Sequence, residues 1–448
     1  MSDQAFNRRE EVLVDEYGNR HQIVGELARG GQGVVYRTTD SDLAIKRPID
    51  RNGEVERSVD LKRRFTRIRC LPLPLDISIA LPLAVLRDES GYVMNLLSEM
   101  EPFSNFFVNG SIYERLETEV IPPWISQVSD RAAQLQLMHY AHSGSTKRRL
   151  LALSKCASVL SRLHSAGIVY GDVSPRNCFV SRQDSQSVSL IDADNLRLEG
   201  HKGGSSVYTP RYGAPEIVSG ADSSRPQSDA WSFSVMAFEI LSLIHPFVGR
   251  AVLEGDSGES GWDVKTTEIG QSRERQQLDE LAMAGKMPYV DDPVDRTNEA
   301  VGGLPRELIV TKRLIELFRE SLGTGRSLPW RRSALAYWAL ELARAHDLSV
   351  VCPSCSMSYF VQHQTCVYCG RPRPLTIVAT TERWQLVLQP SAEVAVLPQR
   401  LTQPFSLHPF DRSEVSVEID SKERLVVRAR GSQPLHDGIE FKFLDGAA

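Results

Sequence analysis

Residues 169–180 read VYGDVSPRNCFV, and residues 189–194 read SLIDAD. Together they carry an acid, an amide five positions later, and a second acid after an apolar run: Asp172, Asn177 and Asp192. Downstream, YGAPE occupies residues 212–216 and DAWSF occupies residues 229–233. Each motif alone is open to chance, but a fixed order of several motifs argues against coincidence.

A glycine cluster lies upstream of these motifs. Residues 22–48, QIVGELARGGQGVVYRTTDSDLAIKRP, predict strands joined by a Gly-rich turn, because β-branched and small residues alternate around the glycines. Glycines leave backbone N–H groups open to a phosphate. Lys46, one of only ten lysines, ends an apolar strand where its ammonium can pair with phosphate oxygens. By themselves, a glycine turn and a solvated strand-end lysine are both ordinary structural features.

The ordered set of motifs resembles the eukaryotic-like (Hanks-type) serine/threonine protein kinases. The resemblance implies an α+β, bilobal protein-kinase-like fold that transfers the γ-phosphate of ATP to protein hydroxyls. It implies that Asp172 orients the incoming hydroxyl, with Thr209 helping to position this base. Asn177 and Asp192 would be the ligands of Mg²⁺, or Mn²⁺, on the nucleotide phosphates.

The resemblance also implies a nucleotide site assembled from several segments. Glu56 is expected to be the partner of Lys46, and Met94 is expected at the gatekeeper position. The expected nucleotide-binding residues are Ala28, Gly30, Gly31, Gly33, Val35, Lys46, Glu56, Met94, Leu97, Glu99, Asn177 and Asp192.

The sequence departs from the family pattern at three places. The His-Arg pair before the catalytic acid is Tyr170-Gly171, which predicts activity without activation-loop phosphorylation. The lysine expected two positions past Asp172 is a serine, and Arg176 is expected to supply the missing positive charge. The metal-binding triplet is Asp192-Ala193-Asp194, in which Asp194 either binds a metal ion or caps the next turn.

Four of the seven cysteines form two CxxC pairs separated by ten residues: Cys352, Cys355, Cys366 and Cys369. This spacing is typical of a structural Zn²⁺ site in a zinc ribbon, with four thiolate ligands and no open position for catalysis. A nucleic-acid role for the ribbon is disfavoured, because no stripe of basic and aromatic residues surrounds it beyond Arg371 and Arg373. We expect it to act as a rigid spacer or a protein-docking module.

Length, composition and charge limit the class of protein. The chain has 448 residues with 41% hydrophobic and 24% charged residues, as expected for a folded protein of two or three domains. With a net charge of −5, the chain has no excess of basic residues that would attract nucleic acid, and we expect no nucleic-acid partner. Without an apolar run of membrane length or a secretory signal, the sequence predicts a cytoplasmic protein with no membrane association.

Hydrophobic periodicity divides the chain into a strand-rich start, a helical middle and a strand-rich end. Helices are expected over residues 148–164, 228–243 and 333–348, and a β-hairpin is expected from EVSVEID and ERLVVRAR. The predicted domains are a kinase N-lobe (17–100), a kinase C-lobe (101–349), a zinc ribbon (350–374) and a small all-β domain (375–448).

Two other functions remain open from the sequence. The first is an ATP-binding pseudokinase or adaptor that acts through the ribbon and the β-domain; retention of Lys46, Asp172, Asn177 and Asp192 argues against it. The second is a small-molecule phosphotransferase, against which the Ala214-Pro215-Glu216 segment speaks.

GDVSPRN and IDADN resemble bacterial kinases of tellurite-resistance-associated systems. That resemblance implies a protein substrate, a cognate metal-dependent phosphatase and a von Willebrand A-type protein as partners, in bacterial signalling.

Overall fold

A computed structural model describes residues 11–30, 33–50, 52–75, 77–183, 187–200, 208–254, 268–390, 395–396, 414–419, 425–430 and 439–444. The chain divides into two compact units. Unit 1 comprises Met1–Phe103 and Ser158–Phe233, and unit 2 comprises Ser104–Ala157 and Ser234–Ala448. Helices and sheets are both extensive, so the fold is α+β, and the predicted domain boundaries stay predictions.

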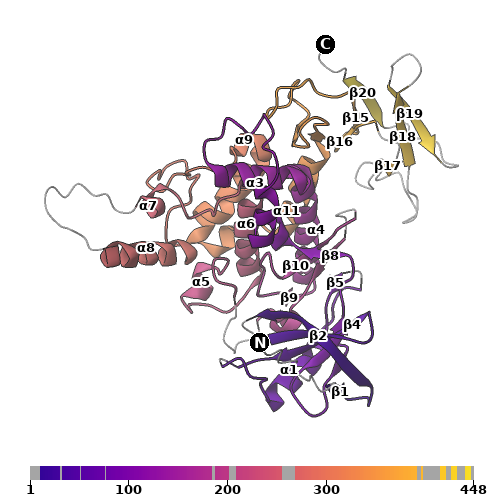
Figure 1. Cartoon of the computed structure of the whole chain (residues 1–448), viewed down its shortest axis with the longest axis vertical. Helices are drawn as coiled ribbons and strands as arrows, with labels where there is room; N and C mark the ends of the chain where they lie inside the picture. Colours follow the sequence, from indigo (N-terminus) through magenta and orange to yellow (C-terminus); the bar gives the residue numbers. More distant parts are fainter. Residues whose placement is uncertain are drawn as a thin grey trace, which may run out of the picture. The chain divides into compact units, whose positions relative to one another are not determined.

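Unit 1 is built around a six-stranded sheet in the order β1-β2-β3-β4-β7-β6 (Figure 1). Its strands are β1 (Val12–Val14), β2 (Arg20–Gly30), β3 (Gly33–Thr38), β4 (Leu43–Pro48), β6 (Ala84–Val85) and β7 (Tyr92–Asn95). Consecutive partners run antiparallel. The predicted strands around the glycine cluster are confirmed. The chain reverses between β6 and β7, where the Leu86 amide donates to the Gly91 carbonyl at 2.9 Å.

Helix α1 (Val59–Arg69) packs against this sheet, and the sequence analysis did not predict it. Only Phe65 and Ile68 are buried along the helix, so the apolar face is too narrow to produce a clear helical period. Asp60 in the first turn and Arg67 and Arg69 in the last turn complement the helix dipole.

Shorter strands complete unit 1. A four-stranded sheet has the order β5-β11-β10-β8, and β9 pairs with β12. Their bounds are β5 (Ser78–Ile79), β8 (Met100–Pro102), β9 (Ile168–Val169), β10 (Cys178–Ser181), β11 (Val188–Leu190) and β12 (Arg197–Leu198). The β10-β11 hairpin separates the two motif stretches, so Asn177 immediately precedes β10 and Asp192 follows β11 after one residue.

Unit 2 contains most of the helices. Two helices contribute residues to both units, α4 (Ser145–Ser165) and α6 (Pro226–Ser242). The remaining helices of unit 2 are α2 (Gly110–Glu117), α3 (Arg131–His142), α7 (Arg250–Leu253), α8 (Glu268–Met283), α9 (Arg306–Ile309), α10 (Lys312–Phe318) and α11 (Leu335–Asp347); the short α5 (Pro215–Val218) belongs to unit 1. The three helices predicted from periodicity, now α4, α6 and α11, are confirmed.

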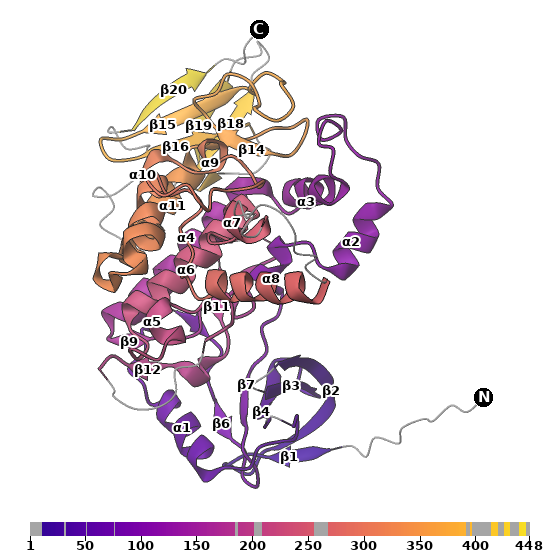
Figure 2. The same cartoon turned by 90° about the vertical axis from the view of Figure 1, so that its left-hand side faces the viewer.

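The strands after α11 form three small sheets in unit 2 (Figure 2). Their members are β13 (Ser349–Val351) with β14 (Ser358–Phe360); β15 (Thr376–Thr380) between β16 (Gln385–Leu388) and β20 (Glu440–Leu444); and β17 (Ala395–Val396), β18 (Glu414–Ile419) and β19 (Leu425–Arg430). The predicted hairpin is confirmed, since β18 and β19 pair antiparallel along their full length.

Helix α11 is joined to the last sheets by apolar packing and one buried polar contact. Ala343 of α11 lies in a core cluster with Ile377, Trp384 and Leu388. The Trp384 indole Nε1 donates a 2.7 Å hydrogen bond to the carboxylate of Asp347, which is only 1% exposed. This part of the tail is therefore packed on the helical part of unit 2.

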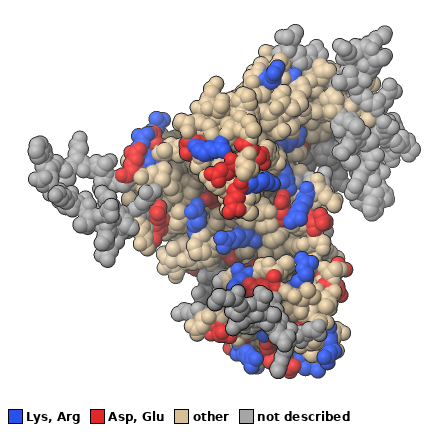
Figure 3. Space-filling model, viewed as in Figure 1, with Lys and Arg blue, Asp and Glu red and all other residues tan. Residues whose placement is uncertain are grey.

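Basic and acidic side chains are mixed on the surface. On the face drawn in Figure 3, blue and red residues lie side by side over much of the described chain. Exposed ion pairs such as Arg250 with Glu299 and Arg313 with Glu316 contribute to this mixing. No helix among the described residues combines the length and the apolar character needed to cross a bilayer.

Trp384→Phe should lower the free energy of unfolding by roughly 1–3 kcal/mol, because it removes a donor from the buried Asp347 carboxylate while keeping most of the apolar surface. Thermal and urea unfolding of the full chain would measure the change. Trp330→Phe, at a side chain that is 71% exposed, is the matched control and should leave the transition in place. Equal shifts for the two variants would contradict this prediction.

Candidate functional site

Lys46 lies on β4 with its ammonium between two carboxylates of unit 1. Its Nζ donates to Asp192 and, at 2.7 Å, to Asp194. Burial alone would lower the pKa of Lys46, but the charges of Asp194 and Asp192 raise it above its ordinary value. The lysine is thus a fixed positive charge, as a phosphate anchor requires.

Asp172 is held from two sides. Thr209 Oγ1 donates to its Oδ1 at 2.7 Å, and Asn177 Nδ2 donates to its Oδ2 at 3.0 Å. Burial raises the pKa of Asp172 above its ordinary value, the nearby charge of Asp192 adds to the rise, and the two hydrogen bonds oppose it. The structure therefore brings Thr209 and Asn177 to the acid with which the sequence analysis grouped them.

A second acid, Asp229 at the start of α6, fixes the backbone before Asp172. Its carboxylate accepts hydrogen bonds from the amides of Tyr170 at 2.8 Å and Gly171 at 2.9 Å, and lies 3.0 Å from His164 Nε2. Sequence reasoning placed Asp229 in a motif but gave it no function. The available signal was an acid at the start of a strongly apolar helix. A carboxylate buried there needs hydrogen-bond donors, which indicates that it holds a neighbouring segment.

The glycine turn joins β2 to β3. Gly33 requires the absence of a side chain, since a Cβ there would lie 2.8 Å from the Arg47 carbonyl oxygen. Gly30 pairs with Gly33, Ala28 pairs with Val35, and Val35 in turn lies opposite Lys46 on β4. The register therefore places Val35 directly opposite Lys46, with Ala28 on the next strand and the Gly30–Gly33 pair at the end of the turn. Gly31 lies outside the described residues.

The remaining predicted nucleotide residues of unit 1 follow the last long strand. Met94 on β7 is buried beside Tyr92 in the core under the sheet. Leu97 is half-buried and Glu99 is exposed in the segment between β7 and β8, where Glu99 has a positive φ of 53°. A contact of Met94, Leu97 and Glu99 with the nucleotide stays a prediction.

Two predicted side chains are not brought to a partner. Glu56 is exposed before the start of α1, and in the described part of the chain Lys46 forms its ion pairs with Asp192 and Asp194 instead. Arg176 is exposed and has no ion pair among the described residues, while the neighbouring Ser174 is fully buried. The expected lysine–glutamate pair is therefore replaced by contacts to the residues of the metal-binding triplet.

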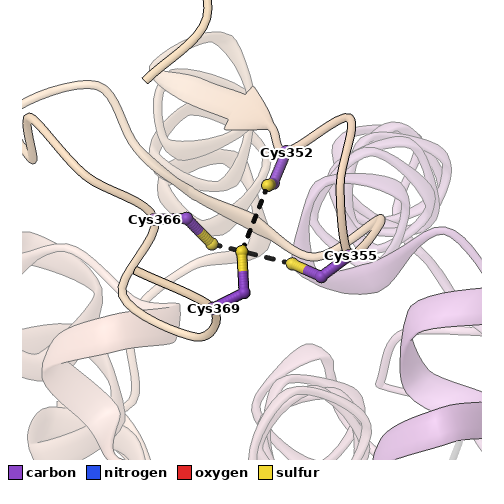
Figure 4. Close-up of side chains that lie close together, drawn as sticks. All are labelled: Cys352, Cys355, Cys366 and Cys369. Atoms are coloured by element: carbon purple, nitrogen blue, oxygen red, sulfur yellow. Dashed lines mark hydrogen bonds between the residues drawn. The ribbon is translucent and has the colours of Figure 1, made fainter. Parts of the chain in front are cut away.

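The four ribbon cysteines converge in unit 2. Their side chains point toward one another (Figure 4), and the four Sγ atoms all lie within 4.8 Å of one another. Cys352 and Cys369 are 3.6 Å apart, and Cys355 and Cys366 are 3.7 Å apart. Four thiolates bound tetrahedrally at about 2.3 Å would be separated by roughly 3.8 Å, so the donor set fits Zn²⁺.

Each CxxC pair sits in a tight turn that is followed by a left-handed residue. Ser356 has a φ of 60° and Gly370 a φ of 70°, which reverses the chain after each second cysteine. The Cys352 amide donates to the Met357 carbonyl at 2.9 Å, and the Cys366 amide donates to the Arg371 carbonyl at 2.7 Å. The backbone itself thus aims all four thiols at one point.

The ribbon is fastened to the beginning of α4. Ser145 Oγ accepts a hydrogen bond from the Ser358 amide at 2.9 Å, and Ser358 Oγ accepts one from the Lys147 amide at 2.8 Å. Lys147 Nζ donates to the Ser349 carbonyl at 2.8 Å, and burial lowers the pKa of Lys147 to about 8. Within unit 2 the ribbon is therefore part of the packed structure rather than a separate module.

Comparison with known proteins supports this reading of the site. The family model described as "Protein kinase domain" matches residues 125–280, which span Asp172, Asn177, Asp192 and Asp229. Over these residues the chain is similar to protein kinase domains, and both helices and strands lie in the matched segment.

The relatives that the chain matches are named as kinases. The chain is 28% identical over 244 residues to serine/threonine-protein kinase pkn2 of Myxococcus xanthus, covering 51% of this chain and 25% of the relative. It is 37% identical over 93 residues to the G2-specific protein kinase fin1 of Schizosaccharomyces pombe (19% and 12%). It is 31% identical over 99 residues to ribosomal protein S6 kinase alpha-3 of Homo sapiens (22% and 13%). The chain spans a quarter or less of the length of these relatives.

Cys366→Ser should reduce bound zinc from about one ion per chain to a small fraction, because three thiolates and a hydroxyl bind Zn²⁺ far more weakly than four thiolates. It should also lower the thermal midpoint, since the ribbon is hydrogen-bonded to α4. Metal analysis and thermal unfolding of the purified full chain would measure both effects. Cys70→Ser, at an exposed cysteine, is the control. Wild-type zinc content in Cys366→Ser would exclude the assignment.

Proposed function

We propose that the protein is an active, ATP-dependent serine/threonine protein kinase. The single observation that carries this proposal is the carboxylate of Asp172, buried and held by Thr209 at one oxygen and by Asn177 at the other. A catalytic base must be fixed relative to the incoming hydroxyl, because phosphoryl transfer depends mostly on positioning and charge neutralisation.

Each nearby side chain has a distinct task in the proposed reaction. Asp172 orients the substrate hydroxyl and accepts its proton as the oxygen attacks the γ-phosphorus of ATP, while the bond from this phosphorus to the bridging oxygen breaks and ADP leaves. Lys46 binds the phosphates, and Asp192 with the amide oxygen of Asn177 would hold Mg²⁺ or Mn²⁺. When bound, the metal ion neutralises charge on the phosphate oxygens. Arg176, the exposed cation four residues past the base, is proposed to face the transferring phosphoryl group.

The nucleotide would lie along the β2-β3 turn and the linker after β7. Ala28, Gly30, Gly33 and Val35 are proposed to cover the phosphates and the ribose, and Met94, Leu97 and Glu99 to surround the base. Glu56 is not carried into this proposal, because it is exposed and Lys46 is paired elsewhere.

Substrate and setting follow from weaker evidence. Serine/threonine kinase relatives support a protein hydroxyl as the acceptor. Zn²⁺ in the ribbon is proposed to be structural. Bacterial signalling in the cytoplasm, and a phosphatase or a von Willebrand A-type protein as partner, rest on the resemblance of the sequence motifs alone.

The decisive experiment is phosphate transfer from labelled ATP by the purified full chain with Mg²⁺ and a library of serine and threonine peptides. Asp172→Asn should lower the rate by roughly 100- to 10,000-fold, because the base is lost while the shape is kept. Nucleotide binding should persist in this variant. Nucleotide binding without transfer by the wild type, to any peptide or to itself, would favour the adaptor function instead.

Thr209→Val should move the acidic limb of the kcat–pH profile to higher pH. Only ionised Asp172 can accept the proton, so kcat falls as the pH drops through its pKa. The Thr209 hydrogen bond lowers that pKa, and removing it raises the pKa further above the ordinary value. Asp192, whose pKa burial also raises, is not bonded to Thr209, so the difference between variant and wild type reports on Asp172. Thr209→Ser keeps the hydroxyl and should restore the wild-type limb; an unmoved limb in Thr209→Val would contradict the assignment.

A further inference from the structure

The carboxylate of Asp194 is fully engaged by protein donors. Its Oδ2 accepts from Lys46 Nζ at 2.7 Å, and its Oδ1 accepts from the Tyr92 hydroxyl at 2.8 Å. Tyr92 is completely buried, and Lys46 and Asp194 are both less than 9% exposed. With both oxygens occupied in a buried setting, this acid is placed to hold the lysine rather than to bind a metal ion.

Helix α1 brings no carboxylate to the lysine. Its one acid, Asp60, has a side chain that is 91% exposed and lies 3.8 Å from Arg63. The helix instead buries Phe65, whose ring meets the Tyr92 ring edge-on at a centroid distance of 4.8 Å. The helix thus supports Tyr92, and Tyr92 in turn supports Asp194.

The turn that carries Asp194 is fixed in two further ways. Asp192 adopts a left-handed conformation (φ 58°, ψ 50°), which starts the short 3₁₀ turn η2 (Ala193–Asn195). Arg64 of α1 donates to Asn195 Oδ1 at 3.1 Å. Ala193 is fully buried and its small side chain allows the close approach of the turn. These contacts direct the Asp194 side chain toward β4 and β7.

We propose that Asp194 is the positioning residue for Lys46, with Tyr92 as its support, an inference that rests on the kinase function proposed above. In protein kinases the strand lysine is held by a glutamate of the helix, which must be in place for activity. Here the acid comes from the turn that also carries the proposed metal ligand Asp192. The phosphate anchor and the metal ligand are therefore set by one rigid element, and no acid of α1 is needed.

Asp194→Asn should lower kcat/KM for ATP by roughly 10- to 100-fold, because it replaces a charged hydrogen bond to Lys46 by a neutral one. Most of the loss should appear in KM for ATP. Tyr92→Phe should have a smaller effect in the same direction and should add nothing in the Asp194→Asn background, since its hydroxyl acts through that carboxylate. Asp60→Asn, at the exposed acid of α1, is the matched control with unchanged kinetics.

Two comparisons separate positioning from the other roles. The Mg²⁺ concentration for half-maximal rate at saturating ATP should stay at the wild-type value in Asp194→Asn and should rise in Asp192→Asn. A rise in Asp194→Asn would make this residue a metal ligand and overturn the inference. Glu56→Gln should leave KM for ATP unchanged; a larger loss in Glu56→Gln than in Asp194→Asn would return the role to the residue favoured by sequence.

The same variants distinguish failure of this inference from failure of the proposed function. If the wild type transfers no phosphate, the kinase proposal fails, and the dissociation constant of a fluorescent ATP analogue still tests the role of Asp194. Weaker binding in Asp194→Asn than in Asp60→Asn supports the inference. Equal binding in the two variants, with equal thermal midpoints, overturns it.

Discussion

A buried ammonium between two carboxylates is the interaction on which the catalytic unit depends. Removing the charge of Lys46 from water is costly, and only close counter-charges make the arrangement stable. Asp192 and Asp194 provide them from a segment more than 140 residues away in the sequence. The contact therefore ties the six-stranded sheet to the segment that follows β11, and it fixes the positions of Lys46, the proposed phosphate anchor, and of Asp192, the proposed metal ligand.

The same principle explains the rest of the constellation. Asp172 and Asp229 are also buried acids of unit 1, and each is stable because donors surround it: a hydroxyl and an amide for Asp172, two backbone amides and an imidazole for Asp229. The donors of Asp229 come from the chain just before Asp172. Asp229 thus fixes the backbone that presents Asp172, and the carboxylate proposed as the base is held by contacts within the protein.

These relations also show what sequence can and cannot predict. Asp172, Asn177 and Asp192 could be grouped from the sequence because they lie in one short segment: Asp172 and Asn177 are five positions apart before β10, and the hairpin β10-β11 separates Asn177 from Asp192. The four cysteines could be found for the same reason. The contacts of Asp194 could not be predicted, because its partners Tyr92 and Lys46 lie 102 and 148 positions away in the sequence. Glu56 was expected to pair with Lys46 because it is an acid close in sequence, but α1 begins after it and turns Phe65 inward. Short strands and helices with narrow apolar faces leave no periodic signal, whereas α4 and α6, buried over long stretches, do.

The ribbon illustrates how a local motif gains its meaning from packing. Two CxxC turns would form the same thiol cluster on an isolated hairpin, and by spacing alone a spacer and a docking module are equivalent. In unit 2, however, Ser145 starts α4 in a left-handed conformation (φ 54°), which costs free energy for a residue other than glycine. The Ser145 hydroxyl accepts a hydrogen bond from the Ser358 amide, and the Ser358 hydroxyl accepts one from the Lys147 amide. Strand β14, which follows the first CxxC pair, thus provides an acceptor for an amide in the first turn of α4 that has no partner within the helix. Strands β13 and β14 flank the first CxxC pair. A metal ion that holds these thiols would therefore also hold Ser358 in place, and through its hydrogen bonds it would stabilise the start of α4.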